Sequence, residues 1–396
     1  MDTAEPVSFN NTQIAFANKT DRGLRRAYWL FRIINNNLLV STGPVLLSVA
    51  QAIHLPVLGI IKNTLYKQFV GGETIEECNN TIQKLGKFDV GTILDYAGEG
   101  GTTEEDFNHT AREVMATIDR AAGDEFIPFS VFKPTGIMRF GLLEKVNTNA
   151  ELSFEEKSEW QRTVERFEMI CKHGFEKNVP VFVDAEESWI QDAIDDLVDE
   201  MMAKYNKQKA IIYNTIQLYR HDRLEFLRKS HEKAIAGNYF LGMKLVRGAY
   251  MEKERKRAQK LNYNDPIQPN KEATDRDYNA AQEYCMQHLD RISFCSGTHN
   301  EHSCKLLVES VNNKNINRKD FRVYFSQLLG MSDHISFNLA DKGYNVAKYV
   351  PYGPVKTMIP YLTRRAQENT SIAGQMGREL HLIIKEMRRR KRKKLS

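Results

Sequence analysis

The sequence lacks the cysteine spacing of a zinc site and of a closed set of disulfides. It contains no C-x-x-C pair, and an odd number of cysteines leaves at least one thiol outside any complete pairing. We therefore expect a reducing compartment and no structural metal. The five cysteines are Cys78, Cys171, Cys285, Cys295 and Cys304.

The first residues also lack the patterns of a targeting segment. Met-Asp-Thr-Ala-Glu-Pro is acidic, and neither the apolar core of a signal peptide nor an arginine-rich transit pattern follows it. The sequence therefore predicts a cytoplasmic location rather than import into an organelle.

Formal charge is absent from segment 38–61, which is long enough to span a membrane. Pro44 and Pro56 interrupt its helix continuity, and glycines, serines, a histidine and a glutamine interrupt its apolarity. We expect two buried or interfacial helices here, with a membrane span as the less favoured alternative.

Positive charge is concentrated near the end of the chain. The net charge is +5, and the run 388–394 consists of seven basic residues, so the remaining chain carries −2. Leu382, Ile383, Ile384 and Met387 precede this run. The pattern predicts contact with an anionic membrane surface, which would place the protein peripherally on the inner face of the cell membrane. A solvated tail and non-specific binding of nucleic acid are the alternatives.

A chain of 396 residues exceeds the usual size of a single core. From Asp89 onward, short β-branched or aromatic runs alternate with longer helical patterns, which is typical of βα units in a parallel sheet. The predicted strands are 90–96, 127–133, 179–184, 210–217, 241–246, 292–298, 322–326 and 346–350.

Eight βα units favour an α/β fold of the (βα)8 barrel type over an open doubly wound sheet, and no G-x-G-x-x-G follows the first strand. We expect an N-terminal helical arm over 1–88, the barrel over 89–376, and a C-terminal helix with a basic tail over 377–396. The helices predicted from periodicity include 22–35, 74–85, 103–121, 154–177, 188–205 and 223–236.

Segment 361–371 is predicted to be the helix after the eighth strand. Tyr361, Arg364, Arg365 and Glu368 stand at i, i+3, i+4 and i+7, so they share one face. Two adjacent arginines at a partly dry edge suit a carboxylate or phosphate. The same pattern also fits a solvated helix with an ion pair between Arg364 and Glu368.

Polar residues follow almost every predicted strand. In a barrel, the chemistry lies at the carboxyl ends of the strands, where a purely structural protein has no need for desolvated polar groups. The shared position indicates a functional site. The polar strand ends include Lys133, Asp184, Gln217, the segments 247–250 and 297–300, and Tyr349.

Taken together, these segments resemble the proline dehydrogenase family. The matching motifs are Lys-Leu-Val-Arg-Gly-Ala-Tyr at 244–250, Val-Asp-Ala-Glu-Glu at 183–187, Gly-Thr-His-Asn at 297–300, Leu-Gly-Met at 329–331, and Tyr349 with Tyr-Leu-Thr-Arg-Arg at 361–365. The resemblance implies a distorted (βα)8 barrel that holds FAD. It also implies oxidation of L-proline to 1-pyrroline-5-carboxylate by hydride transfer from C5 to flavin N5, with electrons passed to a membrane quinone.

The resemblance assigns residues to the substrate. Lys133, Arg364 and Arg365 would bind the proline carboxylate, and Glu368 would balance their charge. Expected around the pyrrolidine ring are Asp184, Ala249, Leu328, Tyr349 and Tyr361.

The resemblance also assigns residues to the cofactor. Gln217 and Lys244 would hydrogen-bond the flavin ring, and Gly248 would allow close approach of the backbone. The remaining residues assigned to FAD are Val246, Arg247, Ala249, Tyr250, Lys271, Thr274, Thr298, His299 and Asn300. Bifunctional bacterial members carry arginine at the position of Lys244 and tryptophan at that of Met251, so the chain looks more like the monofunctional, eukaryote-like branch.

Three other functions remain open. A hydroxyproline dehydrogenase would use the same site, although Tyr349 resembles the residue that crowds the ring and so favours proline. A non-catalytic carboxylate-binding barrel would keep the cations without a flavin. A methylenetetrahydrofolate reductase would need a folate-sized pocket and a nicotinamide donor, for which the sequence offers no feature.

Overall fold

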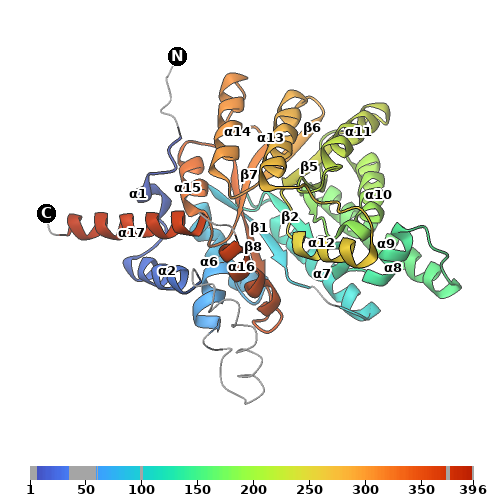
Figure 1. The fold of residues 1–396 in the computed structure, drawn as a ribbon, viewed down its shortest axis with the longest axis horizontal. Helices are drawn as coiled ribbons and strands as arrows, with labels where there is room; N and C mark the ends of the chain where they lie inside the picture. The colour runs from blue at the N-terminus through green and yellow to red at the C-terminus, as the bar shows by residue number, and fades with distance from the viewer. Residues whose placement is uncertain (1–6, 35–58, 60, 99–100, 372–374, 395–396) are drawn as a thin grey trace. The chain divides into compact units, whose positions relative to one another are not determined.

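Eight strands form a closed barrel whose order follows the chain from β1 to β8 (Figure 1). Neighbouring strands from β1 to β7 pair in parallel, as expected when each strand is followed by a helix. The strands are β1 (Val90–Tyr96), β2 (Phe129–Phe132), β3 (Val181–Val183), β4 (Ile212–Gln217), β5 (Leu241–Val246), β6 (Ile292–Gly297), β7 (Val323–Leu328) and β8 (Val346–Tyr352). The predicted barrel and all eight predicted strands are confirmed.

This computed structural model describes residues 7–34, 59, 61–98, 101–371 and 375–394, without the side chains of 366–371 and 375–376. The predicted interfacial segment 38–61 therefore lies outside the described residues, apart from Gly59 and Ile61. No helix in the described ranges is long and apolar enough to cross a bilayer.

An aromatic cluster joins β2, β3, β4 and β7 near their amino ends. The rings of Phe129 and Phe182 stack with centroids 4.3 Å apart, and Tyr213 and Tyr324 meet Phe129 edge to face. Side chains two residues apart in a strand share a face. Residues two or four positions beyond the cluster, toward the carboxyl ends, therefore lie on the same face as these rings.

Local capping explains several helix boundaries. Thr103 and Ser153 each form a complete capping box, with Asp106 and Glu156. Before α6, Thr74 accepts a hydrogen bond from the N–H of Glu77. The helices up to β4 are α1 (Thr12–Ala15), α2 (Asp21–Ile34), η1 (Lys62–Tyr66), α5 (Lys67–Phe69), α6 (Ile75–Gly86), α7 (Glu104–Ala121), η2 (Pro134–Gly136), α8 (Phe140–Asn147), α9 (Phe154–Lys177) and α10 (Ser188–Tyr205).

The helices after β4 include a pair between β5 and β6. They are α11 (Arg223–Ala236), α12 (Met251–Leu261), α13 (Lys271–Gln287), α14 (Glu301–Asn313), α15 (Asp333–Asp341), α16 (Ile359–Ser371) and α17 (Gln375–Lys393). Helix α16 is the predicted helix after the eighth strand.

The chain divides into two compact units, one formed by 1–92 with 327–396 and the other by 93–326. The boundaries predicted from the sequence, at 88 and 376, remain a prediction.

In the first unit, α17 packs on α1 and α2. Leu382 and Ile383 are each only 1% exposed, so the protein itself covers these two residues of the apolar pattern that precedes the basic run. Any contact of this helix with a membrane would therefore rest mainly on charge.

Candidate functional site

Four charged side chains form a ladder near the carboxyl ends of β1, β2, β3 and β5. The amine of Lys133 lies 3.2 Å from Asp95 Oδ1 and 3.2 Å from Asp184 Oδ2. The other carboxylate oxygen of Asp184 accepts a hydrogen bond from Lys244. Two lysines and two aspartates thus alternate, and their formal charges sum to zero. We call Asp95, Lys133, Asp184 and Lys244 the charge ladder.

Burial makes the charge ladder electrostatically strong. Lys244 is only 4% exposed, and its amine also lies 5.5 Å from the ring centroid of Phe182. Burial raises the pKa of Asp184, but Lys244 and Lys133 outweigh this effect and hold the pKa below its ordinary 3.8. Asp184 is therefore ionised at neutral pH and orients both lysines.

Asp95 was not among the residues predicted from the sequence. It lies near the end of β1, in the run Thr-Ile-Leu-Asp-Tyr, and is 8% exposed. A carboxylate at the end of the first buried strand is the signal that could have identified it.

A second buried carboxyl group lies next to this region. Glu186 accepts hydrogen bonds from the N–H and the hydroxyl of Thr135, at 2.8 and 2.6 Å. Burial raises the pKa of Glu186 to about 7, although the bonds from Thr135 oppose the shift. This group can therefore change its protonation near neutral pH.

Arg247 connects several residues that the sequence assigned to FAD. Its guanidinium donates to Asp275 at 2.7 Å, to Thr298 at 2.6 Å and to Ser303 at 2.9 Å. Lys271 pairs with the same Asp275. Arg247 and Thr298 are thus bonded directly, and Asp275 links Lys271 to Arg247. Asp275 and Ser303 were not predicted from the sequence.

The turn after β5 requires glycine because of its own backbone conformation and its packing against another side chain, with or without a cofactor. Gly248 has φ +125°, and a Cβ placed there would lie 2.4 Å from the ring of Tyr219. The backbone N–H of Tyr219 donates to the carbonyl of Arg247 at 2.7 Å, which fixes the turn. Gly248 and Ala249 are exposed, Val246 and Tyr250 are half-buried, and Met251 is 41% exposed.

The other residues assigned to FAD lie in different local environments within the unit 93–326. Gln217 is buried at the end of β4, and its Oε1 accepts no hydrogen bond from any described residue. Thr274 donates to the carbonyl of Asn270 within α13. Asn300 caps α14 and His299 is half-buried beside it.

The first unit holds the remaining predicted substrate residues. The N–H of Leu329 donates to the carbonyl of Tyr349 at 2.8 Å, which links the ends of β7 and β8. On α16, the guanidinium of Arg365 lies 5.4 Å from the ring centroid of Tyr361. Tyr361, Arg364 and Arg365 are half-buried, as is Leu328, whereas the side chain of Glu368 lies outside the described residues.

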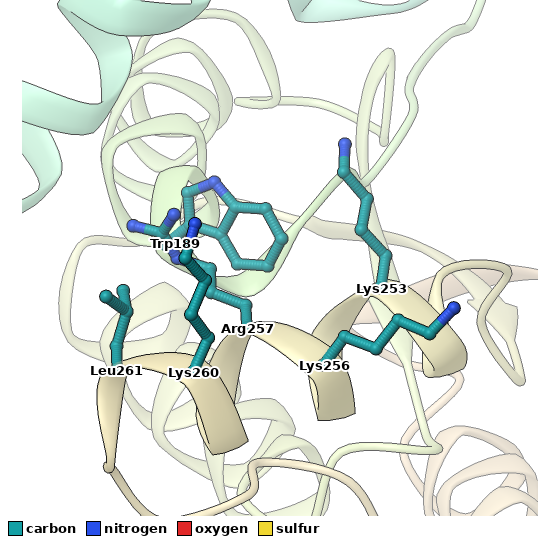
Figure 2. A pocket seen from close by; sticks show the side chains of 6 residues that line it. All are labelled: Trp189, Lys253, Lys256, Arg257, Lys260 and Leu261. Atoms are coloured by element: carbon teal, nitrogen blue, oxygen red, sulfur yellow. The ribbon is translucent and has the colours of Figure 1, made fainter.

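A pocket of about 250 Å³ opens between α10 and α12 (Figure 2). Figure 2 shows its cationic side chains around the indole of Trp189, and Arg257 lies 4.5 Å from that ring's centroid. None of its lining residues belongs to the predicted site. They are Trp189, Lys253, Lys256, Arg257, Lys260 and Leu261.

Most of the chain matches a known protein family. The family model described as proline dehydrogenase matches residues 78–378. The chain belongs to the proline dehydrogenase family. It is accordingly an oxidoreductase of the proline dehydrogenase type.

Relatives in this family carry different names. The chain is 35% identical over 322 residues to the carbapenem antibiotics biosynthesis protein CarD of Pectobacterium carotovorum subsp. carotovorum, covering 81% of this chain and 83% of that protein. It is 32% identical over 426 residues to proline dehydrogenase 1, mitochondrial, of Dictyostelium discoideum, covering 96% and 74%. It is 30% identical over 422 residues to the hydroxyproline dehydrogenase of Xenopus laevis, covering 97% and 90%.

Proline utilization A from Bdellovibrio bacteriovorus shares the fold of this proline dehydrogenase family chain. The TM-score is 0.72 at 20% sequence identity, and the match covers 96% of this chain. The chain spans 41% of the length of that larger protein.

Proposed function

We propose that the chain catalyses the FAD-dependent oxidation of L-proline to 1-pyrroline-5-carboxylate and passes the electrons to a membrane quinone. Family membership supports the reaction class. The observation that carries the proposal is the charge ladder, which holds Lys133 between two carboxylates at the strand ends of the barrel. When bound, the flavin would supply N5 as the acceptor of the hydride from C5 of proline.

The residues present fit a flavin. The buried Oε1 of Gln217 accepts no hydrogen bond from the described residues, and a flavin ring N–H could donate to it. Around Arg247, side chains from the turn after β5, from α13 and from the β6–α14 turn already form one network. The proposed FAD site consists of Gln217, Lys244, Val246, Arg247, Gly248, Ala249, Tyr250, Lys271, Thr274, Thr298, His299 and Asn300.

The charge balance supports a role for both arginines of α16. Because the charge ladder is neutral, a substrate carboxylate needs further positive charge to offset its desolvation. Arg364 and Arg365 are the family's candidates, and each can bind a carboxylate with two parallel hydrogen bonds. Lys133 and these arginines belong to different compact units, so their joint action remains part of the proposal.

The other substrate residues are proposed to shape the pocket around the ring. Asp184 would hold Lys133 in one orientation, and Glu368 would balance the charge of the arginines. The apolar and aromatic wall would consist of Ala249, Leu328, Tyr349 and Tyr361. A rigid wall holds C5 in one orientation, which is the main contribution a protein can make to hydride transfer.

Hydroxyproline oxidation is the second candidate, favoured by the similarity to the Xenopus laevis hydroxyproline dehydrogenase over 97% of the chain. The two can be separated by turnover with a soluble dye as acceptor. We expect a higher kcat/KM for L-proline than for trans-4-hydroxy-L-proline. A clear preference for hydroxyproline would reverse the assignment, and turnover of neither amino acid would refute the proposed reaction.

A further inference from the structure

Helix α2 exposes a face that is both basic and apolar. Leu24, Ala27, Leu30, Phe31 and Ile34 are buried on its other side. The exposed residues recur at helical spacing, so they form one continuous stripe. We call this stripe the α2 basic face, and it consists of Arg22, Arg25, Arg26, Trp29, Arg32 and Ile33.

We propose that the α2 basic face, together with the exposed basic end of α17, binds an anionic phospholipid surface. This binding is independent of the proposed reaction, because none of these residues belongs to the proposed substrate or cofactor site. It would hold the enzyme on a membrane whatever substrate it oxidises.

The arginines of the face form no ion pair within the part of the chain that the structure describes. Asp21 is the only acidic residue of α2. Arg32 donates to the hydroxyl of Tyr28 at 3.0 Å and lies 5.5 Å from the ring centroid of Trp29. Four arginines on one helix therefore present charge to the outside.

The two apolar residues of the face are more than half exposed. Trp29 is 58% exposed and Ile33 is 52% exposed, and they stand at i and i+4, so they are neighbours on the helix surface. Tryptophan flanked by arginine matches the interface of a bilayer, where the indole lies at the level of the headgroups. A nucleic acid backbone would form ion pairs with the arginines but would not bury Ile33.

Helix α17 adds positive charge beside the start of α2. Arg390 donates to Asp21 at 3.0 Å and to the carbonyl of Lys19 at 2.8 Å, and Lys394 also pairs with Asp21. These bonds fix the C-terminal end of α17 beside the start of α2. The exposed residues Arg388, Lys391 and Arg392 on that end form no ion pair within the described chain.

The direct test is sedimentation of the full-length protein with phosphatidylglycerol/phosphatidylcholine vesicles and with pure phosphatidylcholine vesicles. We expect binding only to the anionic vesicles, weakening as salt is raised. Each basic residue near an anionic surface strengthens binding about fivefold, so Arg25→Gln with Arg26→Gln should weaken it about 25-fold. The matched control, Lys256→Gln with Lys260→Gln on α12, removes two charges from the other compact unit and should bind like the parent.

Fluorescence gives a second readout that does not depend on the charge variants. The sequence has three tryptophans, and Trp160→Phe with Trp189→Phe leaves Trp29 alone. Its emission should shift to the blue on anionic vesicles and stay unchanged on phosphatidylcholine. An unshifted emission, equal losses in the α2 and α12 variants, or no binding to anionic vesicles by the parent protein would overturn the proposal. Tighter binding to a DNA duplex with no Trp29 shift on vesicles would assign the face to nucleic acid instead.

Discussion

The two carboxylates of the charge ladder differ in the lysines that they contact. Asp184 accepts hydrogen bonds from Lys133 and Lys244, whereas Asp95 pairs with Lys133. We therefore predict that Asp184→Asn destabilises the protein more than Asp95→Asn, although both substitutions remove one negative charge and preserve the shape of the side chain.

The expected losses in the free energy of unfolding depend on how many of the two lysines each carboxylate contacts. Removing one partner of a buried ion pair costs about 3–5 kcal/mol, and a hydrogen bond to a charged group contributes about 1.5–3 kcal/mol. We expect a loss of about 4 kcal/mol for Asp184→Asn and about 2 kcal/mol for Asp95→Asn, since the latter leaves Lys133 its bond to Asp184.

The dependence on pH gives an independent check of the same residue. Because the folded protein holds the pKa of Asp184 below its ordinary 3.8, this carboxylate stabilises the fold above that pH. The contribution is lost as the pH falls through the lower, folded-state pKa. The stability of Asp184→Asn should therefore decline less than that of the parent between pH 4 and pH 2.

Urea unfolding at matched cofactor content, read from the ratio of flavin to protein absorbance, measures these differences. Adding Lys244→Met to Asp184→Asn should recover part of the lost free energy, because it removes the buried amine that the aspartate neutralised. Equal losses from Asp184→Asn and Asp95→Asn, with no recovery in the double variant, would refute the idea that Asp184 is shared.

Further predictions concern the turn, the titrating carboxyl and the arginine helix. Gly248→Ala should lose about 2 kcal/mol in urea unfolding because of its φ of +125° and the contact with Tyr219, whereas Gly141→Ala, with only a side-chain atom 3.6 Å away, should be nearly neutral; similar losses would contradict the strain argument. Between pH 5 and 8, the parent should lose up to about 3 kcal/mol of stability as Glu186 ionises, because its folded pKa of about 7 exceeds the ordinary 4.5, and Glu186→Gln should flatten this part of the curve. An unchanged curve would show that Glu186 does not titrate there. Arg365→Ala should raise KM for proline far more than it lowers FAD content in steady-state and absorbance measurements, and an equal effect on both would argue against carboxylate binding.

The fold was largely predictable because the strands are mostly buried and contain short β-branched or aromatic runs that alternate with helical patterns. Helix α9 was predicted at the bounds observed, since Ser153 caps its start and Asn178 ends it in a left-handed conformation. The predicted ends of β7 and β8 were two residues short. The predicted strands excluded Gln327 and Pro351, yet Gln327 is buried in β7 and accepts a hydrogen bond from Ser336 at 2.7 Å.

The sequence predicted residues of the candidate site only where a polar residue lies at the end of a strand. Lys133, Asp184 and Lys244 were named from the sequence, but their arrangement around shared carboxylates depends on neighbouring strands. Asp275 and Ser303, which bind Arg247, lie 28 and 56 residues away from it in the chain. No local pattern connects such positions, so the sequence could not predict this network.

The proposed oxidation of proline by a bound flavin can be observed in one experiment. It is an absorption spectrum of the purified protein, reconstituted with FAD where needed, during anaerobic titration with L-proline. We expect flavin absorption bands that bleach as proline is added, with 1-pyrroline-5-carboxylate formed in proportion. A protein that stays colourless and inert after addition of FAD, or flavin bands that proline leaves unchanged, would contradict it.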